Sequence, residues 1–122
     1  MAAKPMNART LDMVAERFRV LGDPSRLRLL QALAEKERTV ADLTAQAEAS
    51  QANVSKHLGV LLRAGLVARR KEGLFVYYRL ADPRVLQMCD LMCGSIQAGL
   101  ATALSAFEPA RAARPARAKG GK

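Results

Sequence analysis

Residues 50–67 restrict the fold more than any other segment, because they describe one helix with two unlike faces. The aliphatic residues of this segment recur at the spacing of a single buried stripe: Val54, Leu58, Leu61 and Leu62. Ser50 is suited to cap the helix by accepting a hydrogen bond from a free backbone N–H, and Gly65 to end it in the left-handed conformation. The segment therefore predicts a helix that packs along one side only.

The open side of this helix is small and polar toward its N-terminus. Its residues are Gln51, Ala52, Ser55 and Lys56. Such a slim face fits the major groove of DNA, where Gln51 can pair with adenine and Ala52 can contact a thymine methyl group. Ser55 and Lys56 can meet a base edge or a phosphate. The alternative is an ordinary solvated surface.

The rest of the chain predicts further helices and a β-hairpin, from capping residues, proline positions and apolar periodicity. Helices are expected over residues 10–21, 24–34, 40–47 and 83–107, and strands over 66–71 and 74–80. Together with the helix that Ser50 begins, this order is ααααββα. It predicts a mainly α fold with a β-hairpin wing (α+β), a winged helix-turn-helix. The expected domain covers residues 10–107, between a loose lead (1–9) and a basic disordered tail (108–122).

The net charge of +9 favours a polyanionic partner. No stretch approaches the roughly 20 apolar residues that a membrane span needs, and the N-terminus lacks the apolar run of a signal peptide. We therefore expect a cytoplasmic protein that makes no membrane contact. An enzyme is not expected, because the sequence shows neither a nucleophile–base constellation nor a phosphate-binding glycine loop.

Several segments, in order and in register, resemble the arsenic-repressor (ArsR/SmtB) family. They are Leu21–Leu30, Val40–Leu43, Ser50–Leu58, Ala64–Val67 and Gly73–Tyr78. The resemblance implies a homodimeric winged-helix repressor that pairs through its first and last helices and binds a palindromic operator on double-stranded DNA. An inducer, often a metal or metalloid ion, would bind and release the DNA.

The predicted DNA contacts extend beyond the four residues of the open face. Asn53 is expected to reach either DNA or the preceding turn, and His57, the only histidine, either packs or contacts a phosphate. The hairpin adds Arg69, Arg70 and Lys71, which can follow the DNA backbone or the minor groove. The alternative for the hairpin is a charged edge that discourages strand pairing.

The expected inducer site lies in the last helix, at Cys89 and Cys93. The family's cysteine-containing run in the third helix corresponds to Thr39–Leu43, which has no cysteine, and the last helix has no histidine. A spacing of four places both thiols on one helical face, where they can chelate thiophilic As(III) or Sb(III). No cofactor is required. Redox or persulfide sensing and simple packing are the alternatives for the two thiols.

A rival of a different class is a non-specific basic nucleic-acid-binding protein. It would explain the charge and the tail, but not the paired helix caps and the slim helix face. Readers of RNA usually carry aromatic stacking platforms, and the five scattered aromatic residues do not supply one.

Overall fold

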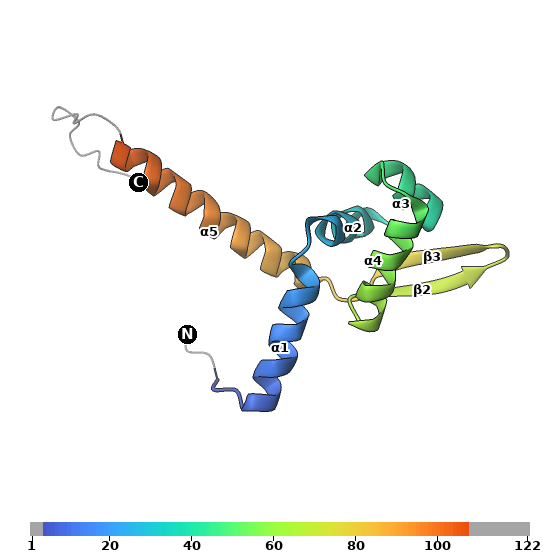
Figure 1. Ribbon diagram of the computed structural model, residues 1–122, viewed down its shortest axis with the longest axis horizontal. Coiled ribbons are helices and arrows are strands. Elements are labelled where there is room, and N and C mark those ends of the chain that lie inside the picture. The colour runs from blue at the N-terminus through green and yellow to red at the C-terminus, as the bar shows by residue number, and fades with distance from the viewer. Residues whose placement is uncertain (1–3, 108–122) are drawn as a thin grey trace. The chain divides into compact units, whose positions relative to one another are not determined.

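The computed structural model describes residues 4–107, which are mostly helical (Figure 1). The elements are α1 (Ala8–Leu21), α2 (Pro24–Glu35), β1 (Arg38–Thr39), α3 (Val40–Ala47), α4 (Gln51–Arg63), β2 (Val67–Glu72), β3 (Phe75–Leu80) and α5 (Arg84–Phe107). This order confirms the predicted fold class and adds the two-residue strand β1. The predicted basic tail, residues 108–122, lies outside the described residues.

The chain divides into two compact units, one up to Gln87 and one from Met88 onward. The first unit contains every element through β3 and the first turn of α5. The second contains the remainder of α5, a helix of 24 residues. Within residues 4–107, no helix combines the length and the apolar content needed to cross a membrane. The predicted domain boundaries at 10 and 107 stay a prediction.

Helix starts follow the capping residues of the sequence. The side chains of Asp23, Thr39 and Ser50 accept hydrogen bonds from backbone N–H groups in the first turns of α2, α3 and α4. The start of α1 differs from the predicted start at residue 10: Asn7 is its cap, and the Asn7 side chain accepts from the N–H of Thr10 at 2.8 Å. The helix therefore begins two residues earlier than expected, at Ala8.

Leucines of α2, α3 and α4, and one in the turn that leads into β2, lie in the core of the first unit. The fully buried ones are Leu30, Leu43, Leu58, Leu61 and Leu66. The stripe predicted for α4 is confirmed at Val54, Leu58 and Leu61, whereas Leu62 is only half-buried at the rim. Burying one side of α4 against the other helices fixes which side remains open.

The sheet is antiparallel, with strand order β1-β3-β2. Its hairpin is long and projects beyond the helices in Figure 1. The tight turn lies at Gly73 and Leu74 rather than at Glu72 and Gly73, because Glu72 still pairs with Phe75. Gly73 has φ +62°, a conformation that glycine adopts without strain.

Candidate nucleic-acid interface

The open side of α4 carries the residues predicted to meet DNA. Gln51, Ala52, Asn53, Ser55 and Lys56 are all exposed. Ser50 holds the start of the helix by accepting from the N–H of Asn53 at 3.1 Å. The structure therefore brings these side chains together on a single capped helix end. Their contact with DNA stays a prediction.

A short turn joins α3 to α4. Only residues 48–50 separate the two helices, and Glu48 takes the left-handed conformation with φ 52°. The two helices pack directly against one another, as Figure 1 shows. Together they form the predicted helix-turn-helix, in which α4 is the second helix.

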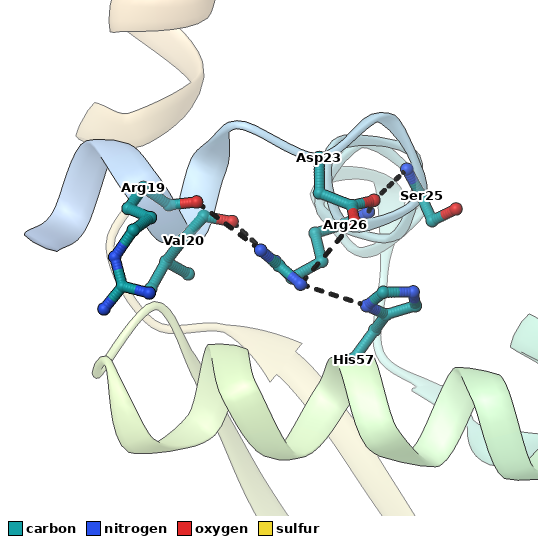
Figure 2. A network of polar contacts seen from close by, with 6 residues as sticks. All are labelled: Arg19, Val20, Asp23, Ser25, Arg26 and His57. Carbon is teal, nitrogen blue, oxygen red and sulfur yellow. Dashed lines mark hydrogen bonds and ion pairs between the residues drawn. The ribbon is translucent and has the colours of Figure 1, made fainter.

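His57 lies on the flank of α4, half-buried, and contacts an arginine of α2 (Figure 2). Nη1 of Arg26 is 3.2 Å from Nδ1 of His57. Because a guanidinium only donates, Nδ1 accepts this bond and the ring carries its proton on Nε2. One nitrogen of His57 is thus committed to holding α4. A phosphate contact through the other nitrogen stays a prediction.

Arg26 connects the end of α1 to α4. Its Nε donates to the carbonyl of Val20 at 2.6 Å, and its Nη2 donates to the carbonyl of Arg19 at 3.4 Å. These carbonyls belong to the last turn of α1, where helical bonding ends. Sequence reasoning missed Arg26, because a charged residue near a helix start gives no signal of an inward position.

Asp23 completes this network from the cap of α2. Desolvation raises the pKa of the Asp23 carboxyl, but hydrogen bonds from the N–H groups of Ser25 and Arg26 and the nearby charges outweigh it. The net effect is a pKa below the ordinary value for aspartate. The carboxylate is therefore stabilised in its ionised form beside the Arg26 guanidinium, 3.7 Å away.

The basic residues of the wing do not share one environment. Arg69, Arg70 and Lys71 are all exposed on β2. Among residues 4–107, Arg70 is the one of the three that forms ion pairs: its Nη2 lies 2.8 Å from Oε1 of Glu37, and its Nη1 pairs with Glu72. The hydrogen bond from Arg70, aided by charge attraction, holds the pKa of the Glu37 carboxyl below its usual range.

Arg70 also stacks on an aromatic ring. Its Cζ lies 4.7 Å from the ring centroid of Tyr77, the residue directly opposite on β3. Sequence reasoning missed the partner Glu37, because it precedes a two-residue strand that shows no apolar alternation. Of the two tyrosines, Tyr78 is the buried one and Tyr77 is half-exposed.

Cys89 and Cys93 are free thiols on α5, half-buried and exposed respectively. Their spacing of one helical turn is the feature that favours chelation. Within residues 4–107, no three His, Cys, Asp or Glu side chains are grouped so that they could hold a metal ion. In this part of the chain, therefore, no further His, Cys, Asp or Glu joins the two thiols to complete a three-ligand site.

The fold and the capped helix define a winged helix-turn-helix domain. Residues 23–69 match the family described as "Bacterial regulatory protein, arsR family". The chain is 42% identical over 80 residues to the "Probable mercury resistance operon repressor" of Streptomyces lividans, covering 66% of this chain and 64% of that protein. It is 47% identical over 75 residues to the "Transcriptional repressor SmtB homolog" of Synechocystis, covering 62% of this chain and 57% of that protein.

A solved structure agrees in fold. It is the homodimeric winged helix-turn-helix DNA-binding domain of Mb0332 from Mycobacterium bovis, described as a possible ArsR-family transcriptional regulator. The TM-score is 0.67 at 32% identity, covering 80% of this chain and 91% of that one. The chain belongs to the ArsR family of bacterial regulatory proteins. Its relatives are regulators and not enzymes, which confirms the expectation that this chain is not an enzyme.

Proposed function

We propose that this chain is a transcriptional repressor that binds a palindromic operator as a homodimer. The observation that carries the proposal is α4, whose N-terminal end exposes Gln51, Ser55 and Lys56 while Val54 and Leu58 anchor its other side. A helix held in this way presents polar groups to base edges in the major groove. The two relatives named above are both described as repressors.

The second unit supports dimerisation. From Leu91 onward, α5 exposes large apolar residues on successive turns: Leu91, Met92, Ile96, Leu100, Leu104 and Phe107. An apolar surface of this length on a single helix favours burial against a partner. A second copy is the occupant that a homodimeric family member suggests. Two recognition helices would then enter successive major grooves about 34 Å apart.

The proposed inducer is a thiophilic metalloid, As(III) or Sb(III), held by Cys89 and Cys93. Two thiolates one helical turn apart provide a soft, bidentate site. A third sulfur can come from the partner subunit or from a small thiol in solution. A relative described as a mercury resistance repressor supports a soft, sulfur-seeking ion as the inducer.

The test is fluorescence anisotropy of the reduced protein on the duplex upstream of its own gene, with a scrambled duplex as the control. We expect tight binding to the first duplex that survives an excess of the second. Arsenite should release the wild type and leave the Cys89→Ser, Cys93→Ser double variant bound. Equal binding to both duplexes would overturn the repressor and favour a non-specific basic nucleic-acid-binding protein.

The second candidate is a repressor of the same fold that senses oxidants or persulfides. The observation in its favour is the exposure of Cys93, which leaves its sulfur open to attack. A disulfide between Cys89 and Cys93 would need local unwinding of α5 or a bond across the dimer. Release by a persulfide donor but not by arsenite, lost in the double variant, would select this candidate.

A further inference from the structure

We propose that Arg70 is a positioning residue of the wing. Its side chain holds the three strands together, so that Arg69 and Lys71 on the opposite face of the sheet can contact the DNA backbone. The inference rests on the proposed function and divides the basic residues of the wing into two roles. Along a strand, successive side chains point to opposite faces of the sheet.

The inner face of the sheet turns toward the helices. Val67 and Tyr78 lie on it and are buried in the core. Arg69 is paired with Tyr78 across the hairpin and Lys71 with Val76, so both basic residues share this face. The side chains of both residues are exposed.

The outer face carries Arg70, paired with Tyr77 across the hairpin. Tyr77 is in turn paired with Thr39 of β1, and Glu37 lies two residues before Thr39 on the same side. The guanidinium of Arg70 therefore reaches from β2, over the ring of Tyr77 on β3, to the carboxylate beside β1. Its Nε is 3.0 Å from Oε2 of Glu37, and its Nη2 is 2.8 Å from Oε1.

This bidentate geometry uses the donors of Arg70 that a phosphate would need. Glu72 pairs with the remaining terminal nitrogen, so two carboxylates offset the single positive charge. A guanidinium in that setting adds little to the attraction of a polyanion. Arg69 and Lys71 take part in none of the ion pairs in residues 4–107, so their charges remain available to phosphates.

The test compares charge-removing variants by anisotropy on the upstream duplex over a range of salt concentrations. Arg69→Gln should reduce the slope of log K against log salt by about 1.8, because the homodimer loses one phosphate contact in each of its two wings, each worth about 0.9. Arg70→Gln should weaken binding several-fold with the slope unchanged. Arg70→Lys should not restore the binding, because lysine keeps the positive charge but lacks the planar guanidinium that binds a carboxylate with two donors and stacks on an aromatic ring.

Glu37→Gln gives the sharpest contrast. It makes the protein more positive, yet it should weaken binding, because it releases the wing. The control is Asp12→Asn, which removes the same charge from an exposed residue of α1, outside the wing and the helix-turn-helix, and should leave binding equal or tighter. The Glu37→Gln, Arg70→Gln double variant should bind about as weakly as Arg70→Gln alone, because both changes break one interaction.

The opposite results overturn the inference. A slope reduced by about 1.8 in Arg70→Gln, with rescue by Arg70→Lys, would make Arg70 a phosphate contact in both wings. Hydrogen exchange without DNA is a separate readout. Arg70→Gln should speed exchange of the hairpin amides, and unchanged exchange would show that the ion pairs of Arg70 with Glu37 and Glu72 do not hold the strands together. A wild type with no preference for the upstream duplex would instead overturn the proposed function.

Discussion

Single residues hold α4 in place in two ways. Leu58 is fully buried and anchors α4 in the core, while His57, on the flank of the helix, forms a hydrogen bond with Arg26 of α2. The first role is visible in the sequence, because apolar spacing predicts burial. The second is not, since Arg26 finds its partners in α1 and α4, and only the tertiary structure brings them within reach.

The capping carboxylate of α2 should give stability a defined pH dependence. The pKa of Asp23 is lowered in the folded state, so its contribution is present above the unfolded pKa and is lost as pH falls through the folded one. Asp23→Asn retains a capping oxygen but does not titrate. The wild type should therefore exceed the variant in Tm near neutral pH, and this difference should shrink below about pH 4. A Tm difference that does not change with pH would contradict this role.

At the scale of elements, the helices could be predicted from sequence better than the sheet. Proline and capping residues fix where α2, α3 and α4 begin, because each satisfies a backbone N–H that would otherwise lack a partner. The strand β1 could not be predicted, because its two residues, Arg38 and Thr39, become a strand only by pairing with β3. The exposed end of α4 could also be predicted, because the helical spacing that places the apolar residues on the buried side places the polar ones on the open side.

The cap of α4 should matter for stability. Ser50→Ala removes the oxygen that accepts from the N–H of Asn53, and should lower the free energy of unfolding by about 1 kcal/mol. Urea denaturation at fixed protein concentration measures this change. Ser50→Asn is the control, because asparagine caps helices as well as serine does. Equal losses in both variants would show that the effect is not capping.

At the scale of the whole molecule, the charge and the apolar surface of α5 point to two partners, DNA and a second copy. The net charge of +9 favours DNA, but it sets affinity rather than sequence preference. The apolar residues of α5 could be recognised from sequence as an amphipathic pattern. Their exposure could not, since the same spacing also suits a helix packed within its own chain.

The dimer should depend on the apolar side of α5. Ile96→Asp places a charge among exposed apolar residues, so it should shift the protein toward monomer and weaken operator binding. Gln97→Asp is the matched control, because Gln97 is an exposed polar residue of the same helix. Sedimentation velocity measures the change in mass. A dimer that persists in Ile96→Asp would place the interface elsewhere.

The most direct test of the central claim is base discrimination by Gln51→Ala. Wild type and variant are compared by anisotropy on the upstream duplex and on duplexes with one base pair changed at a time. If the exposed end of α4 reads the operator, the variant should become indifferent to one base pair in each half-site, where the wild type discriminates by about 1–3 kcal/mol. An equal loss of affinity on every duplex, with discrimination intact, would contradict the account.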